Sequence, residues 1–151
     1  MTPEGGCECG AVRFRLTSDP IVVNCCHCRD CQRITGSAFA VNAMIETARV
    51  QLVRGRPVEL QRDGARAWRC GTCFSLLWAD HTKLGHGLRF VRVGTLDAGE
   101  RLSPDAHFFV RSKHPWVVIP EGVPRFEALP EHGMGVELSP ERKERLAAAA
   151  G

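Results

Sequence analysis

The chain has 151 residues, of which 44% are hydrophobic and 25% are charged. This length and composition are typical of one globular domain and exclude disordered and fibrous proteins. The net charge of +3 is too small to indicate nucleic-acid binding, and no apolar stretch has the length of a signal-peptide core or a membrane span. We therefore expect a cytoplasmic protein without a membrane or nucleic-acid partner. The sequence does not indicate an oligomeric state.

Short segments with a two-residue period predict strands along most of the chain. Residues 12–16 place Val12, Phe14 and Leu16 on one face and two arginines on the other, as in a half-buried strand. Fifteen glycines and nine prolines supply turns between such segments. The sequence therefore predicts a mainly β fold, with further strands at residues 39–45, 50–53, 58–61, 65–69, 74–78, 88–93, 108–110 and 116–119.

Few helices are expected, and both candidates are short. Residues 30–34 can form one helical turn that ends at Gly36. Near the C-terminus, Ser139 suits an N-cap and Pro140 the first helical position. Leu146 is the one large apolar residue of this second helix, so we expect it to dock loosely. On this basis residues 1–135 form a single β domain and residues 136–151 a C-terminal helical tail.

Eight cysteines are the strongest chemical signal in the sequence. They make up about 5% of the chain, below the level of a disulfide scaffold, and in a reducing compartment thiols bind metals or react more often than they pair. Seven of them form three groups: Cys7 and Cys9; Cys26, Cys28 and Cys31; Cys70 and Cys73. The first and last groups together supply four thiolates, the closed ligand set of a structural zinc site.

The middle group is an incomplete ligand set. Cys26, Cys28 and Cys31 can occupy three corners of a tetrahedron, and an open fourth position distinguishes catalytic from structural zinc. These three cysteines are therefore candidates for a catalytic zinc centre whose fourth position is undecided. The candidates for the fourth position are water, a substrate thiol, Cys25, His27, His81, His86 and His107.

Two other arrangements of the cysteines are compatible with the sequence. Cys25 can complete the middle group, which closes both zinc sites, although adjacent Cys25 and Cys26 must then turn toward one ion. A protein with two closed sites is a zinc-stabilised binding module without catalytic activity. The other arrangement is a disulfide framework, which needs an oxidising compartment.

The same motifs carry a family resemblance. The segments GGCECGAVRFRL, CCHCRDCQRITGSAF, CGTC, GTLD and SPDAHFFVRSKHPW follow one another between about residues 6 and 126, and the three cysteine groups are specific in combination. The sequence resembles the glutathione-dependent formaldehyde-activating enzymes, whose domain also occurs in centromere protein V. The resemblance implies several short curled antiparallel sheets organised around two zinc sites. One zinc site is structural, and its ligands are Cys7, Cys9, Cys70 and Cys73. The second zinc site is exchangeable, and its ligands are Cys26, Cys28 and Cys31.

The activity that the resemblance implies is that of a carbon–sulfur lyase. Enzymes of this kind reversibly join glutathione, or another small thiol, to formaldehyde as an S-hydroxymethyl adduct. Because a thiol bound to zinc is deprotonated, a three-cysteine zinc suits this chemistry. Arg29 and Arg33 lie close in sequence to the metal cysteines and are candidates for binding the carboxylates of glutathione.

Five further positions carry weaker expectations. Ser37 and Phe39 can line a pocket beside the middle cysteines, His107 suits a packing or hydrogen-bonding role, and Trp116 suits a core anchor. The resembling family has glycine where this chain has Phe74, directly after the last cysteine. Because a bulky residue rarely adopts a positive φ, we expect the turn after Cys73 to differ.

Overall fold

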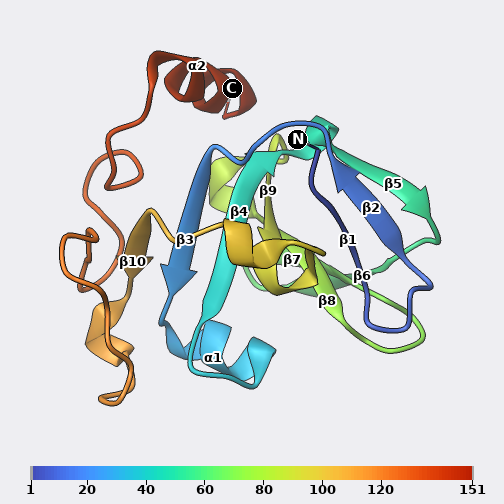
Figure 1. The fold of residues 1–151 in the computed structure, drawn as a ribbon, viewed down its shortest axis with the longest axis horizontal. Helices are drawn as coiled ribbons and strands as arrows, with labels where there is room; N and C mark the ends of the chain where they lie inside the picture. The colour runs from blue at the N-terminus through green and yellow to red at the C-terminus, as the bar shows by residue number, and fades with distance from the viewer. Residues whose placement is uncertain (1, 151) are drawn as a thin grey trace.

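Two β-sheets make up most of the structure, a computed structural model that describes residues 2–150. The strands within these residues are β1 (Glu4–Gly6), β2 (Arg13–Leu16), β3 (Val22–Cys26), β4 (Ala40–Glu46), β5 (Val50–Arg54), β6 (Val58–Arg62), β7 (Ala65–Arg69), β8 (Leu76–His81), β9 (Leu88–Arg92) and β10 (Ala106–Phe108). The smaller sheet has the order β1-β2-β5 and the larger sheet the order β10-β3-β4-β9-β8-β7-β6 (Figure 1). All paired strands are antiparallel except β10 and β3. The predicted mainly β fold is confirmed, and neither sheet closes on itself.

The main core lies between the two sheets. The alternation in β2 points Phe14 and Leu16 inward, where both are fully buried. The Phe14 ring meets the Trp78 ring of β8 edge to face, with 5.3 Å between the centroids, a favoured arrangement for aromatic pairs. This contact joins the smaller sheet to the larger one.

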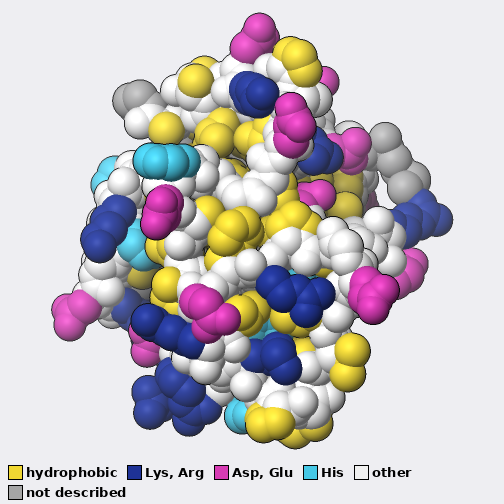
Figure 2. Space-filling view, turned by 90° about the vertical axis from the view of Figure 1, so that its left-hand side faces the viewer, with side chains coloured by type: hydrophobic (Ala, Val, Ile, Leu, Met, Phe, Trp, Pro, Cys, Tyr) yellow, Lys and Arg dark blue, Asp and Glu magenta, His cyan; other side chains and the backbone are white. Residues whose placement is uncertain are grey.

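A second apolar cluster covers the opposite face of the larger sheet. Val22, Met44 and Leu88 come from three neighbouring strands and pack against Leu138 and Leu146 of the C-terminal segment. The segment runs past β10 and returns across this face (Figure 1). On the outer side of this part of the molecule, cationic, anionic and hydrophobic side chains are interspersed (Figure 2).

Two α-helices are present in residues 2–150: α1 (Arg29–Thr35) and α2 (Pro140–Ala149). Helix α1 ends at Gly36, which has a φ of 62°, and α2 begins at the N-cap Ser139, so both predicted helices are confirmed. Five 3₁₀ turns complete the secondary structure: η1 (Thr47–Arg49), η2 (Thr82–Leu84), η3 (Val93–Thr95), η4 (Gly99–Arg101) and η5 (Val110–Ser112). No helix in the described part of the chain is both long and apolar enough to span a membrane.

Helix α2 docks more closely than Leu146 alone predicts. Arg145 donates two hydrogen bonds of 2.8 Å to the carboxylate of Glu46 on β4, and it also reaches the Ser18 hydroxyl at 2.9 Å. The sequence prediction of loose docking considered only the apolar residues of this helix. It therefore missed Arg145, a long cationic side chain that anchors the helix through its charged end.

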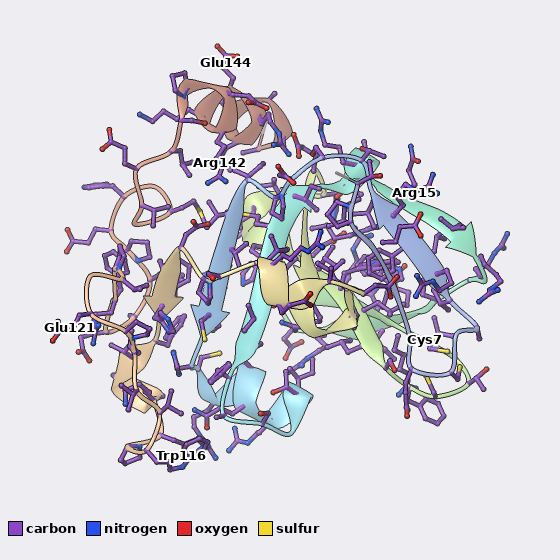
Figure 3. The ribbon with its side chains drawn as sticks, in the orientation of Figure 1. Cys7, Arg15, Trp116, Glu121, Arg142 and Glu144 are labelled. Carbon is purple, nitrogen blue, oxygen red and sulfur yellow. The ribbon has the colours of Figure 1, made fainter. Side chains whose placement is uncertain are left out.

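The sequence prediction placed one strand where there is none and missed two others. Residues 116–119 form a turn and irregular chain instead of a strand. Trp116 is 72% exposed and stacks on His114, so it is not a core anchor; Figure 3 shows it at the outer end of this segment. The prediction also missed β1 and β3. Every residue of β3 is buried, and a strand buried on both faces lacks alternation.

Candidate metal centre and adjoining cavity

The first and last cysteine pairs come together in space. Cys7 and Cys9 lie in the turn after β1, and Cys70 and Cys73 in the turn between β7 and β8. Their four sulfur atoms all lie within 4.8 Å of one another. Figure 3 shows Cys7 at this turn with further sulfur atoms beside it. The structure therefore brings together the four residues that the sequence assigned to one site.

The spacing of these sulfurs fits a tetrahedral metal ion. Four sulfurs placed about 2.3 Å from a central zinc are about 3.8 Å apart from one another. The Cys7 and Cys9 sulfurs are 3.6 Å apart, and those of Cys9 and Cys70 are 3.8 Å apart. Backbone N–H groups of Val12 and Thr72 donate to the sulfurs of Cys7 and Cys70 at 3.2 and 3.4 Å. Such donors stabilise thiolates, so the donor set suits a thiolate-bound cation such as zinc.

The turn after Cys73 keeps the left-handed conformation that glycine would favour. Phe74 has a φ of 64°, and its N–H donates to the Cys70 carbonyl at 3.1 Å. The expectation that Phe74 changes this turn was therefore wrong. The guanidinium of Arg69 lies 4.9 Å from the centre of the Phe74 ring, a cation–π contact that offsets part of the backbone strain. The Ser75 hydroxyl donates to the Cys73 sulfur and lowers the pKa of that thiol to about 5.

The middle cysteines form a separate group at the start of α1. Cys26 ends β3, Cys28 is the N-cap of α1, and Cys31 lies in its first turn. Their sulfurs also lie within 4.8 Å of one another. The Cys26 and Cys31 thiols and the Cys31 N–H, at 3.3 Å, donate toward the Cys28 sulfur and lower the pKa of Cys28. Among the described residues, this metal-capable group contains three ligand atoms and no fourth.

Cys25 is directed to a different place from Cys26. Its sulfur lies 3.6 Å from His27 Nε2, and His27 Nε2 lies 2.9 Å from His107 Nδ1. All three side chains are buried. Burial raises the pKa of Cys25 to about 12 and lowers that of His27 to about 4, so a protonated thiol and a neutral imidazole are favoured. His107 has the hydrogen-bonding role expected for it, and Cys25 belongs to this buried group and not to that of Cys26, Cys28 and Cys31.

A cavity of about 500 Å³ lies between the C-terminal end of α1 and the turn that holds Cys73. Thr35 and Phe39 line one side, and Cys73 and Phe74 line the other. Phe39 is half-buried and lines this cavity. Ser37 is exposed and is not part of the lining. Of the described lining residues, Cys73 is the one cysteine, and Ile34 and Thr35 connect the cavity to the helix that carries Cys31.

The cavity has a cationic residue that the sequence interpretation missed. Arg92, at the end of β9, lines the cavity and interacts electrostatically with the thiols of Cys31, Cys26 and Cys28. The Arg92 Nη1 donates to the side-chain oxygen of Asn42, directly opposite on β4. The sequence alone does not reveal this arrangement, because the arrangement depends on the pairing of β4 with β9.

The other predicted candidates lie away from the cavity. Arg29 and Arg33 are exposed on α1 and do not line it, and Arg29 donates to Gln32 of its own helix. His81 and His86 are exposed at the far end of β8 and in the β8–β9 loop, and neither belongs to a described metal-capable group. The structure therefore leaves the middle cysteines without a histidine partner among these candidates.

Comparisons with known proteins agree with this geometry. A protein of Halomonas elongata, provisionally named a glutathione-dependent formaldehyde-activating enzyme, is 28% identical over 130 residues, which cover 79% of this chain and 82% of that protein. A crystal structure of a Rhodobacter sphaeroides protein is similar with a TM-score of 0.52 and 25% identity, over 63% of this chain and 88% of the other. The model of the family described as glutathione-dependent formaldehyde-activating enzyme matches residues 2–112, which include every cysteine described above. The chain belongs to this family.

Proposed function

We propose that the protein is a zinc-dependent carbon–sulfur lyase that forms and cleaves the S-hydroxymethyl adduct of glutathione or another small thiol. The observation that carries this proposal is the group of three sulfurs at Cys26, Cys28 and Cys31, at the start of the helix whose far end lines the cavity. In this proposal, Cys7, Cys9, Cys70 and Cys73 hold a second, structural zinc. We place the reaction in the cytoplasm, because all eight cysteines are free thiols and such thiols persist in a reducing compartment.

The chemistry requires a thiolate and an aldehyde in one place. Zinc at the three sulfurs supplies a positive charge that keeps an entering thiol deprotonated. The thiolate sulfur attacks the carbonyl carbon of formaldehyde, a carbon–sulfur bond forms, and the carbonyl oxygen takes up the proton that the thiol released. Cleavage is the reverse: the hydroxyl proton leaves, the carbonyl re-forms, and the carbon–sulfur electron pair returns to sulfur.

The protein contributes orientation and a shielded site. Cys28 is fixed by its role as the N-cap of α1, and Cys26 by its place at the end of β3. Phe39 and Val41 give one cavity wall an apolar surface, which keeps water away from the reacting carbon and strengthens electrostatic interactions. A thiol ligand is therefore held beside the sulfur group, and its remaining atoms occupy the cavity.

The test is the rate of adduct exchange between glutathione and ¹³C-formaldehyde, measured by NMR exchange spectroscopy at equilibrium. The zinc-loaded protein is expected to accelerate the exchange of free glutathione with its adduct. Cys31→Ser is expected to abolish the acceleration while retaining the fold, because Cys31 is one of the middle cysteines. Cys25→Ala is the matched control, since its thiol lies in the other buried group. An unaccelerated wild-type exchange would favour the zinc-stabilised binding module instead.

A further inference from the structure

Arg92 occupies an unusual position for an arginine in this protein. Two comparably placed arginines meet carboxylates: Arg89 pairs with Asp80 at 3.1 Å and Arg145 with Glu46 at 2.8 Å. Within residues 2–150, Arg92 forms no ion pair with an aspartate or a glutamate. Its electrostatic partners are instead the thiols of Cys31, Cys26 and Cys28.

The hydrogen-bonding capacity of Arg92 is also incompletely used. Its Nη1 donates to the Asn42 side-chain oxygen, and Asn42 in turn donates to the Asn24 side-chain oxygen at 3.1 Å. Its Nε is buried and has no partner among the described residues. The Nε atoms of Arg66 and Arg69 are likewise buried without a partner among these residues, so the position of Arg92 in the cavity wall is what distinguishes it.

The sheet directs Arg92 toward the middle cysteines. Arg92, Asn42 and Asn24 lie directly opposite one another on β9, β4 and β3, so their side chains share one face of the sheet. Cys26 follows Asn24 by two residues and therefore lies on the same face. It is paired with Ala40, which lines the cavity together with Arg92. The guanidinium and the Cys26 sulfur thus lie on one sheet face, and Arg92 also interacts electrostatically with Cys28 and Cys31 at the start of α1.

We propose that Arg92 is the specificity-determining residue that binds a carboxylate on the same molecule as the thiol. This inference rests on the proposed function, because it assigns a contact to the ligand whose sulfur joins the middle cysteines. Among the described residues that line the cavity, Arg92 is the one with a charged side chain. The protein therefore selects anionic thiols over neutral thiols of similar size, and Arg29 and Arg33 do not carry this selection.

The direct test compares 3-mercaptopropionate with 2-mercaptoethanol by calorimetric titration of the zinc-loaded protein. Because a hydrogen bond to a charged group contributes about 1.5–3 kcal/mol, the wild type is expected to bind 3-mercaptopropionate about tenfold or more tightly than 2-mercaptoethanol. Arg92→Met is expected to abolish that preference, so that the two thiols bind with similar affinity. The control is Arg62→Met, an exposed arginine of the edge strand β6, which is expected to keep the preference.

Three results of the titration would overturn the assignment. They are a wild type without the preference, an Arg92→Met variant that retains it, and equal weakening of both thiols by Arg92→Met. Loss of the preference in Arg29→Met or Arg33→Met, with Arg92→Met unaffected, would assign the carboxylate to α1 instead.

A second measurement uses the unaltered protein and does not depend on thiol binding to metal. The Arg92 Nε–H resonance, assigned with Arg92→Lys, is expected to shift saturably in ¹H–¹⁵N spectra on addition of 3-mercaptopropionate or propionate, and not of 2-mercaptoethanol. If propionate shifts this resonance while neither thiol binds the zinc-loaded protein, the anion site stands and the proposed lyase function fails. If both thiols bind equally and the resonance does not move, the lyase function stands and the role of Arg92 is refuted.

Discussion

The sulfur atoms of Cys9 and Cys70 lie 3.8 Å apart, although 61 positions separate the two residues in the chain. This contact joins the turn after β1 to the turn between β7 and β8, and hence the smaller sheet to the larger one. A metal ion held at this point cross-links two distant parts of the chain, so its binding free energy contributes directly to folding.

Cys70→Ser is predicted to destabilise the whole domain. The free energy of structural zinc binding is on the order of 10 kcal/mol, and Cys70 is 1% exposed, so the oxygen substitute leaves an incomplete and poorly packed site. We expect the melting temperature of the zinc-loaded protein to fall by on the order of 10 °C or more, measured by circular dichroism. A variant that melts with the wild type would show that these four cysteines do not form a structural site.

Cys31→Ser is predicted to act on metal content and not on the fold. The residue is partly exposed on a seven-residue helix and is one of the middle cysteines, so the two sheets do not depend on it. We expect the zinc content to fall to about half that of the wild type, because one of two sites is lost, with a near-wild-type melting temperature. Elemental analysis and circular dichroism measure the two quantities. Unfolding as severe as that of Cys70→Ser would contradict the distinction between the sites.

Cys25→Ala is predicted to leave both the zinc content and the affinity for glutathione unchanged. The Cys25 thiol is grouped with His27 and His107 rather than with the middle cysteines. The loss of one small buried group costs about 1 kcal/mol of stability. A fall in zinc content measured for the purified variant would instead place Cys25 in a closed, four-sulfur site.

The strands that a two-residue period revealed are those with one buried face. β2 alternates between buried and half-buried positions, and its Phe14 and Leu16 were correctly placed in the core. β3 is buried throughout because one face meets the other sheet and the other face meets the C-terminal segment. Such a strand shows no alternation of apolar and polar residues. Its two cysteines were therefore interpreted as metal ligands or thiols, and no strand was predicted.

The cysteine groups were predictable because the spacing of metal ligands can be read directly from the sequence. The residues that line the cavity were not predictable in this way. Arg29 and Arg33 are near Cys28 in sequence but point away on an exposed helix surface. Arg92 is 61 positions from Cys31 and reaches it only through the pairing of β9 with β4. Residues brought together by sheet register cannot be found from local spacing.

Phe74 provides a test of backbone strain beside the Cys73 ligand. Because a left-handed φ costs a residue with a Cβ about 1–2 kcal/mol, Phe74→Gly is predicted to be more stable than Phe74→Ala by about 1 kcal/mol. Both variants lose the contact with Arg69, so the difference between them isolates the conformational contribution. Urea unfolding of the zinc-loaded variants measures it, and equal stabilities would show that the turn relaxes without strain.

The Arg145–Glu46 pair predicts an acid-dependent contribution of α2 to stability. Burial tends to raise the pKa of Glu46, but the hydrogen bonds from Arg145 outweigh it and hold that pKa below its ordinary value of 4.5. A lowered folded-state pKa stabilises the protein above pH 4.5, and this contribution is lost as the pH falls through the folded-state pKa. Arg145→Met is predicted to cost about 2 kcal/mol at pH 7, and the difference from the wild type is predicted to shrink below pH 4.5.

Urea unfolding at several pH values measures this dependence, with Lys143→Met, an exposed residue of the same helix, as the control. If residues 1–135 are the zinc-binding domain, as the sequence predicts, Arg145→Met also leaves the zinc content unchanged. A loss of stability that is the same at pH 7 and pH 4 would mean that Arg145 acts through packing and not through its ion pair.

The most direct test of an exchangeable metal centre at Cys26, Cys28 and Cys31 is the visible absorption of the cobalt-substituted protein during titration with glutathione. Cobalt reports its ligands through d–d and thiolate charge-transfer bands. We predict a saturable change in about half of the cobalt absorption, since one of two sites accepts an external thiolate, and the loss of this change in Cys31→Ser. A spectrum of two four-sulfur sites that glutathione leaves unchanged would contradict the account and favour a zinc-stabilised binding module.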